Sequence, residues 1–313
     1  MFLKAHKSPF SRLVQTTLSR CNMSHFAQFT LKNDSNNEIK VGYLNEDKTK
    51  LLDISKNYSS IDQMIKDTNG AIENANLNHS EQSYLLEDIT FKSPFYNPSK
   101  IVCVGKNYVE HAIETGEGIP KEPVIFNKFQ SSITSHNSHI NIPKIGATVD
   151  WEGELAVIIG KEAYNVKKEN ALDYVAGYTI ANDVSARDWQ KKRNLGQWLI
   201  GKSFNTFCPL GPYFIPKHHI GGLDEVHSLD IKTTVNQKVM QSSNTKNMAF
   251  NVAFIIEWVT QFSTLNVGDV ILTGTPDGCG GFMKPPVFLK AGDVVEVEIE
   301  KLGKLVNNVV DEA

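Results

Sequence analysis

The chain has 313 residues, of which 41% are hydrophobic and 21% charged, and its formal net charge is -3. This composition is that of a globular protein, and the length suits one large domain with a smaller one. No run of about 18 apolar residues occurs, so we expect no membrane association through a spanning helix. Residues 1–28 hold four basic and no acidic residues, which leaves the rest of the chain acidic. Nucleic-acid binding requires a basic surface, so we expect no nucleic-acid partner.

The first 28 residues have the composition of a targeting segment. The first acidic residue is Asp34, and the basic side chains before it alternate with serine and threonine. Apolar residues between Leu13 and Leu18 would form the stripe of a short amphipathic helix. A basic, hydroxyl-rich and acid-free start is typical of a mitochondrial transit peptide, and a cytosolic tail is the alternative. We therefore expect residues 1–28 to be a mitochondrial transit-like segment that directs the protein to the matrix, with the cytoplasm as the alternative location.

Residues 29–98 are expected to form a small N-terminal domain. Two strand-like stretches, at residues 28–31 and 41–44, flank a polar turn, and residues 51–54 continue the pattern. Residues 61–88 show a looser helical spacing of apolar side chains.

Residues 99–313 are expected to form a larger second domain with many strands and few helices. One amphipathic helix is expected over residues 251–262, with Phe262 on its apolar face. No glycine-rich dinucleotide loop follows a strand, so a Rossmann sheet is not expected. The pattern favours a mixed α+β architecture that is mainly β. The expected strands cover residues 101–104, 154–159, 174–181, 270–272 and 294–299.

Three carboxylates stand at the ends of apolar strands. Glu152 and Glu154 share one face of a strand, because side chains alternate along it. Two carboxylates about 4 Å apart repel by roughly 1 kcal/mol in water and about 4 kcal/mol near a protein surface. A divalent cation would remove this conflict, whereas a solvated strand edge would tolerate it. Asp183 follows another apolar strand and offers a third ligand, or caps the helix that follows.

His111 and Glu114 are three residues apart and would lie on one face of a helix. A carboxylate beside an imidazole fixes the tautomer of the ring and raises its basicity, as a general base requires. A surface ion pair is the alternative interpretation. Trp189 and Trp198 are interpreted as core or interface residues. The cysteines lie far apart and indicate neither a zinc site nor a disulfide framework.

Five motifs of this chain resemble those of the fumarylacetoacetate hydrolase superfamily and occur in the same order along the chain. The resemblance is strongest to the subgroup called fumarylacetoacetate hydrolase domain-containing protein 2. The resemblance covers about residues 100–313 and is highly specific as a set. The motifs are VGKNYVEH at residues 104–111, DWEGELAVIIG at 150–160, NDVSARD at 182–188, GKSFNTFCP at 201–209 and TGTPDG at 273–278.

The resemblance implies a β-sandwich roll of the fumarylacetoacetate hydrolase C-terminal type, preceded by a small N-terminal domain, in a homodimer. It also implies a divalent metal ion, Mg²⁺ or else Mn²⁺ or Ca²⁺. Many family members have arginine where this chain has Lys106, and lysine lacks the bidentate fork of arginine. The implied metal ligands are Glu152, Glu154 and Asp183. The implied catalytic residues are His111, Glu114 and Lys202, and the residues near the substrate are Lys106, Lys128, Arg187 and Thr275.

The expected substrate is a small 2-oxo acid, whose carboxylate and adjacent carbonyl together chelate a divalent ion. The resemblance and the leader favour oxaloacetate, with enol-to-keto tautomerisation as the reaction. An acylpyruvate-type C–C bond hydrolase and an oxaloacetate decarboxylase are the alternatives among enzymes. A protein that binds a metal and a carboxylate ligand without turnover is the alternative of another class.

Overall fold

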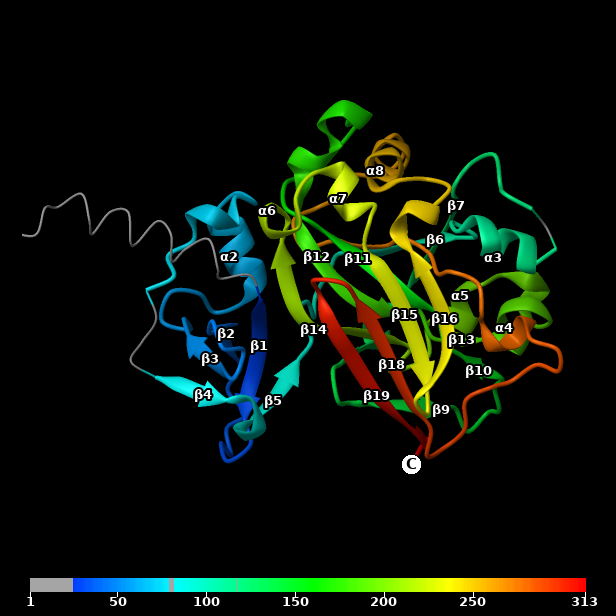
Figure 1. The fold of residues 1–313 in the computed structure, drawn as a ribbon, viewed down its shortest axis with the longest axis horizontal. Coiled ribbons are helices and arrows are strands. Elements are labelled where there is room, and N and C mark those ends of the chain that lie inside the picture. Colours follow the sequence, from blue (N-terminus) through cyan, green and yellow to red (C-terminus); the bar gives the residue numbers. More distant parts are fainter. Residues whose placement is uncertain (1–24, 79–81, 117) are drawn as a thin grey trace, which may run out of the picture.

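The computed structural model describes residues 25–78, 82–116 and 118–313 (Figure 1). Most of the predicted transit-like segment therefore lies outside the described residues. The described part begins close to strand β1 (Phe26–Leu31), which takes in the last three residues of that segment.

The N-terminal unit is a small sheet with one helix, drawn in blue and cyan in Figure 1. Helix α2 (Ile61–Asp67) begins at Ser60, whose side chain accepts a hydrogen bond from the backbone N–H of Gln63. Asn69 and Gly70 follow with φ angles of 51° and 78°, and this left-handed turn ends the helix. The helical spacing predicted up to residue 88 is therefore wrong beyond the first turns. The strands of the unit are β1, β2 (Lys40–Leu44), β3 (Lys50–Asp53), β4 (Ser83–Leu85) and β5 (Ile89–Lys92).

One large sheet runs through both parts of the chain in the order β4-β3-β2-β1-β14-β12-β11-β17-β6-β7. The junction is the antiparallel pair β1–β14, in which Phe26 lies opposite Phe214. Strand β5 pairs with β1, and β8 pairs with β14. The strands not yet bounded are β6 (Ile101–Gly105), β7 (Val124–Lys128), β8 (Ile133–Ser135), β11 (Gly153–Ile159), β12 (Val175–Asn182), β14 (Cys208–Pro216) and β17 (Val270–Leu272).

A second sheet lies in front of the large one in the view of Figure 1, in yellow and red. Its order is β16-β15-β18-β19-β9, and a separate two-stranded pair joins β10 to β13. The bounds are β9 (His139–Ile142), β10 (Val149–Asp150), β13 (Ser185–Ala186), β15 (Asp230–Val235), β16 (Lys238–Asn244), β18 (Val294–Ile299) and β19 (Gly303–Asp311).

Strand β11 is buried on both faces, and its side chains alternate between two hydrophobic cores. Leu155, Val157 and Ile159 pack in the core that also contains residues of the second sheet. Ala156 and Ile158 pack in the core that the large sheet shares with the N-terminal unit. This alternation follows from the two-residue period of a strand, and it agrees with the side-chain pattern predicted from the sequence.

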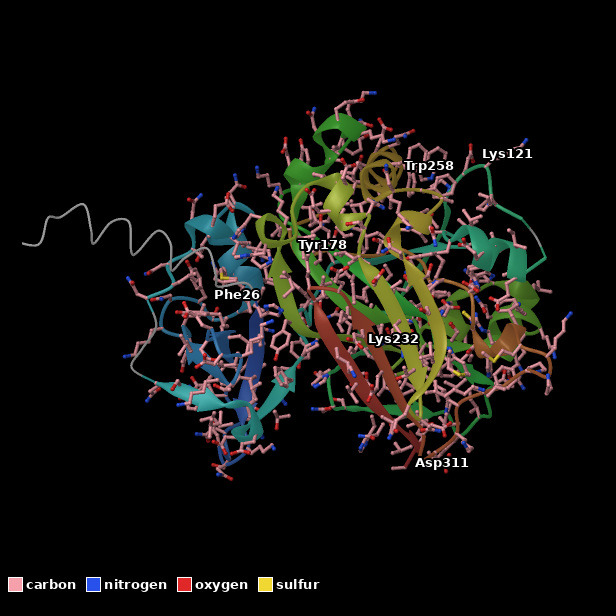
Figure 2. The ribbon with its side chains drawn as sticks, viewed as in Figure 1. Phe26, Lys121, Tyr178, Lys232, Trp258 and Asp311 are labelled. Atoms are coloured by element: carbon pink, nitrogen blue, oxygen red, sulfur yellow. The ribbon has the colours of Figure 1, made fainter. Side chains whose placement is uncertain are left out.

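The N-terminal unit contributes to that second core rather than packing only on itself. Phe26, labelled in Figure 2, lies with its ring centroid 6.5 Å from that of Phe214 on β14. Val41, Tyr43 and Ile54 belong to the same cluster. Burying an aromatic ring of this size stabilises a fold by about 1.5–3 kcal/mol, so the contact links the two parts firmly.

The helices are short, and none of those described is long and apolar enough to cross a membrane. Helix α8 (Val252–Thr260) agrees with the predicted amphipathic helix and is capped by Asn251. Phe262, predicted on its apolar face, follows the helix end and is 61% exposed. The other helices are α3 (Val109–Glu114), α4 (Arg187–Lys191), α5 (Leu199–Lys202), α6 (Lys217–Ile220) and α7 (Leu223–Val226). Short 3-10 helices cover Ile72–Asn74, Leu86–Asp88, Gln130–Ser132, Lys168–Tyr174, Asn194–Gly196, Thr245–Asn247 and Gly280–Phe282.

The architecture is thus mixed and mainly β, as the sequence predicted. Helices α3, α4 and α5 lie on the side of the molecule away from the N-terminal unit (Figure 1). The candidate site lies among these elements.

Candidate metal centre and active site

The three predicted metal ligands meet because β11 and β12 are antiparallel neighbours. Gly153 at the start of β11 lies opposite Asn182 at the end of β12. Glu152 and Glu154 therefore lie beside Asp183, whose backbone N–H donates to the Glu152 carbonyl at 2.8 Å. One carboxylate oxygen from each of the three residues lies within 4.8 Å of the other two, and all three residues are buried.

Asp183 does not cap a helix, so that interpretation is wrong. The two-residue strand β13 separates it from α4, which begins at Arg187 and has Ala186 at its N-cap position. The Asp183 carboxylate instead accepts hydrogen bonds from two lysines.

Three buried cations surround these carboxylates. Lys128, the last residue of β7, places Nζ 2.6 Å from Asp183 Oδ1. Lys202, the last residue of α5, places Nζ 2.7 Å from both Glu152 Oε2 and Asp183 Oδ2. The Arg187 guanidinium, at the start of α4, lies with Nη1 2.6 Å from Glu152 Oε1. Removal of these charges from water carries a penalty that only such close pairing offsets.

The two glutamates differ in how far neighbouring cations offset the cost of burying their negative charge. Burial acts to raise the pKa of Glu152, but the cations of Lys202 and Arg187 outweigh it and hold that pKa well below its usual range. Burial raises the pKa of Glu154 well above its ordinary value, and the carboxylates of Asp183 and Glu152 raise it further. The electrostatic repulsion predicted from the sequence is therefore concentrated on Glu154.

A divalent cation fits this donor set. Asp150 adds a fourth buried carboxylate, which accepts from Arg187 Nε at 2.7 Å and from the backbone N–H groups of Gly280 and Gly281. The buried carboxylates of the centre therefore outnumber its three lysine and arginine cations by one. Hard carboxylate oxygens are the ligands that Mg²⁺, Mn²⁺ and Ca²⁺ prefer. A divalent ion would favour the ionised form of Glu154, would outweigh the single excess negative charge of the four ionised carboxylates, and would make the centre attractive to an anion.

The loop after β17 supplies backbone donors to two carboxylates of the site. The N–H of Gly274 donates to Glu154 Oε2 at 2.6 Å, and that of Gly278 donates to Glu114 Oε1 at 3.1 Å. Both glycines have positive φ angles, 98° and 94°. A Cβ on Gly278 would collide with the carbonyl oxygen of Met240, so this close approach requires glycine. The backbone of this loop thus donates hydrogen bonds to carboxylates of the protein itself.

Gln241, a buried residue of β16, ties this loop to the start of β11. Its Oε1 accepts from the Gly153 N–H at 3.0 Å, and its Nε2 donates to Thr275 Oγ1 and to the Pro276 carbonyl at 2.8 Å. The Thr275 hydroxyl in turn donates to the Gly153 carbonyl at 2.9 Å. Gly153 lies between the two glutamates, so this network fixes the backbone that carries them.

The predicted His111–Glu114 pair forms on helix α3. Nδ1 of His111 lies 3.0 Å from Glu114 Oε2, and His111 is only 6% exposed. This burial excludes the alternative of a surface ion pair. The Phe282 ring stands edge-on to the imidazole, with centroids 5.3 Å apart. Because Nδ1 faces Glu114, Nε2 is the ring nitrogen left to meet a substrate.

A cavity of about 340 Å³ is lined by two carboxylates of the cluster, Glu152 and Glu154, and by His111. Lys106, Arg187, Lys202 and Thr275 also line it. Asp183, Glu114 and Lys128 lie behind the lining residues. A carboxylate oxygen of Asp183 lies within 4.8 Å of those of Glu152 and Glu154, Glu114 lies against His111, and Lys128 lies against Asp183. The structure therefore gathers every predicted site residue around one cavity, seven of them on its wall: Lys106, His111, Glu152, Glu154, Arg187, Lys202 and Thr275.

Several lining residues were not predicted. Trp198 lines the cavity and does not belong to the hydrophobic core. Gly105 leaves room for the Trp198 ring, because a Cβ on residue 105 would lie 2.7 Å from that ring. Gln190 lies one helical turn after Arg187 and accepts from its Nη1 at 3.0 Å. Helical spacing from Arg187 was a signal that could have identified Gln190. No comparable signal pointed to Lys191, because a charge at a helix end is usually a solvated one.

Comparisons with known proteins agree with the motifs. The family profile described as fumarylacetoacetate (FAA) hydrolase C-terminal matches residues 100–310. The Xenopus laevis protein named oxaloacetate tautomerase fahd2, mitochondrial, is 54% identical over 223 residues, which are 71% of this chain and 69% of that protein. The Homo sapiens protein named oxaloacetate tautomerase FAHD2A, mitochondrial, is 52% identical over 223 residues, which are 71% and 70% of the two chains. The Dictyostelium discoideum fumarylacetoacetate hydrolase domain-containing protein 2 homolog is 48% identical over 230 residues, 72% and 75% of the two chains.

Solved structures extend the similarity to the N-terminal unit. The fumarylacetoacetate hydrolase of Exiguobacterium antarcticum superposes with a TM-score of 0.77 at 34% identity, covering 92% of this chain and 100% of that one. The 2-hydroxyhepta-2,4-diene-1,7-dioate isomerase of Mycobacterium marinum superposes with a TM-score of 0.73 at 32% identity, covering 93% and 99%. By profile, by identity and by fold, this chain belongs to the fumarylacetoacetate hydrolase family, in the group of fumarylacetoacetate hydrolase domain-containing protein 2.

Proposed function

We propose that this protein is a divalent-metal-dependent oxaloacetate tautomerase, which converts the enol form of oxaloacetate to the keto form. The observation that carries the proposal is a single cavity lined by Glu152 and Glu154 of the buried three-carboxylate cluster and by His111, which Glu114 orients from behind. The relatives that share 52–54% identity with this chain are named for the same activity.

Glu152, Glu154 and Asp183 would hold the metal ion, with Mg²⁺ as the first choice and Mn²⁺ or Ca²⁺ as alternatives. When bound, the ion polarises the carbonyl of a 2-oxo acid and lowers the energy of negative charge on its oxygen. The fit rests on the oxygen-only donor set and on the excess of buried carboxylates.

His111 moves the proton. Tautomerisation removes one proton from the C2 hydroxyl of the enol and adds one at C3. The imidazole, oriented through Nδ1 by Glu114, exchanges protons at Nε2. A positioned acid–base group of this kind contributes about 10²–10⁴-fold to a rate.

Arg187 and Lys202 bind the negative charge of the substrate. Arg187 Nη2 is buried and has no hydrogen-bond partner among the described residues, although the guanidinium lines the cavity. A buried unpaired donor is costly, and a substrate carboxylate would satisfy it. Lys202 is 1% exposed and lines the same wall, where its ammonium stabilises charge on the C2 oxygen. Lys106 and Thr275 add polar groups to the substrate surface, and Lys128 positions Asp183.

The test is the decay of enol-oxaloacetate absorbance with purified protein and Mg²⁺. We expect the protein to accelerate the decay over buffer containing Mg²⁺, without parallel CO₂ release. A rate no faster than that of buffer would reject the tautomerase assignment.

Two other enzymes of 2-oxo acids would use the same residues. The similarity to a fumarylacetoacetate hydrolase favours hydrolytic C–C cleavage of an acylpyruvate as the second candidate. Progress curves that follow acylpyruvate loss and CO₂ release separate that hydrolase and an oxaloacetate decarboxylase from a tautomerase. A non-catalytic binding protein would bind Mg²⁺ and 2-oxo acids but turn over none of them.

The mitochondrial matrix is the proposed location, because the relatives are named mitochondrial and residues 1–28 have transit-peptide composition. Cleavage leaves β1 intact only if it occurs before Phe26, so we propose a mature N-terminus at or before Phe26. Sequencing of the N-terminus after import into isolated mitochondria tests this boundary. A homodimer is also proposed, and light scattering of the purified protein tests it.

A further inference from the structure

The outer part of the cavity carries a cation that the proposed reaction has not used. Lys191, the last residue of α4, lines the cavity but is exposed, whereas Glu152, Glu154 and Lys202 on the inner wall are buried. Lys191 therefore lies at the mouth of the cavity, and the carboxylate cluster lies at its inner end.

Phe282 holds Lys191 at that position. The Lys191 Nζ lies 3.8 Å from the centroid of the Phe282 ring, a short distance for a cation above an aromatic face. The same ring contacts the His111 imidazole edge-on and lies 5.3 Å from the Arg187 guanidinium carbon. One aromatic side chain thus connects the candidate base to a cation at the entrance.

The spacing suits a substrate with two acidic ends. The 3.8 Å and 5.3 Å separations put Lys191 Nζ at most about 9 Å from the centre of the His111 ring. A base reaches a reacting carbon at about 3–3.5 Å, and an ammonium contacts a carboxylate at about 2.7–2.9 Å. A carboxylate attached directly to the reacting carbon fits between these two groups.

We propose that Lys191, held by Phe282, recognises a distal carboxylate, so that the site selects 2-oxo dicarboxylates over 2-oxo monoacids. This inference rests on the proposed function for the orientation of the substrate, with its 2-oxo acid end at the carboxylate cluster. That orientation points the remainder of the substrate past His111 and toward the mouth, where Lys191 lies.

The experiment compares oxaloacetate with its 4-methyl ester, which keeps the 2-oxo acid end and lacks the distal charge. Lys191→Gln should lower kcat/KM for oxaloacetate about 10-fold, mainly through KM, and leave the ester within about twofold. Lys191→Arg should restore most of the loss, since it keeps the charge and the contact with the ring. Lys192→Gln is the matched control, because that neighbouring lysine is exposed and does not line the cavity.

Equal losses on both compounds, or no loss on either, would overturn the inference. The inference would also be overturned if Lys106→Gln lost the preference for oxaloacetate over the ester while Lys191→Gln kept it, because Lys106 lines the cavity too. Phe282→Leu should weaken the selection as Lys191→Gln does and also lower kcat, because the ring contacts His111.

A binding measurement separates this inference from the proposed function. With Mg²⁺ present, calorimetry compares 2-oxoglutarate with 2-oxopentanoate, which have equal chain lengths and differ in the terminal carboxylate. Tighter binding of 2-oxoglutarate that is lost in Lys191→Gln would support the inference even if no tautomerase activity were found. Active wild-type enzyme with equal affinity for both compounds would reject the inference and leave the proposed function standing.

Discussion

The carboxylate cluster and the His111–Glu114 pair are built in different ways. At the inner end, Glu152, Glu154 and Asp183 stand at the termini of two paired central strands, and hydrogen bonds and buried cations hold them. Between that cluster and the mouth of the cavity, His111 stands on the six-residue helix α3, positioned by one glutamate and one aromatic ring.

The difference matches the role that is proposed for each of the two groups. A charge cluster needs a rigid frame, since a misplaced buried carboxylate or cation loses the pairing that offsets its desolvation. A proton-transferring group needs one fixed tautomer and access to substrate, and a single neighbouring carboxylate provides the first. Changes at the inner end should therefore affect metal affinity and stability, whereas changes at His111 should affect turnover alone.

The largest expected effect is loss of the metal ion. Glu154→Gln, or treatment with a chelator, should lower turnover by about 10³-fold or more, because metal ions supply several kcal/mol of charge stabilisation. Calorimetry with Mg²⁺ should show weaker binding to the variant. Glu87→Gln, an exposed change in the N-terminal unit, is the control. Full activity in the metal-free protein would show that the carboxylates do not serve a metal.

His111→Gln should lower turnover by about 10²–10⁴-fold while leaving Mg²⁺ affinity nearly unchanged. Glutamine keeps a polar side chain but cannot exchange a proton near neutral pH. Steady-state kinetics measures the turnover, and calorimetry measures the Mg²⁺ affinity. A parallel fall in Mg²⁺ affinity and turnover would contradict the division of roles between the carboxylate cluster and His111.

Lys202→Met should destabilise the protein by about 3–5 kcal/mol, because it leaves the buried Glu152 and Asp183 without their shared cation. The structure places the ammonium between two carboxylates, where burial acts to lower its pKa but Asp183 and Glu152 raise it overall. Urea unfolding with and without Mg²⁺ measures the change. Mg²⁺ should raise the free energy of unfolding more in the variant than in the wild type. An equal gain in both would argue that Lys202 and the metal ion do not offset the same carboxylates.

The smallest expected effect is that of Gln241→Ala, which should weaken Mg²⁺ binding by about 10–100-fold. Gln241 touches no ligand side chain, and it acts by fixing Gly153 and Thr275. Gln241→Glu is the informative comparison, because it keeps the acceptor for the Gly153 N–H and loses the donors. Intermediate metal affinity in that variant would assign part of the effect to each bond, whereas unchanged affinity in both variants would remove Gln241 from the positioning network.

Most strands were predictable, because their signals are local. The apolar stretches at 101–104, 270–272 and 294–299 agree with β6, β17 and β18. The helix predicted over 61–88 failed where Asn69 and Gly70 turn the chain, since spacing of apolar residues alone does not register a left-handed turn. Trp198 was misplaced for a similar reason, because a large aromatic residue looks the same in a core and on a cavity wall.

Local patterns in the sequence were enough to predict the residue types at the site, the alternation of side chains along β11 and, through the motifs, the family. These are properties of short segments, and a strand or helix period is enough to express them. Three contacts could be seen only in the folded protein: Glu152 lies beside Asp183, Lys202 lies between their carboxylates, and Gln241 accepts a hydrogen bond from the Gly153 N–H. Such contacts join residues many positions apart in the chain, so they depend on sheet order and register, which no local pattern encodes.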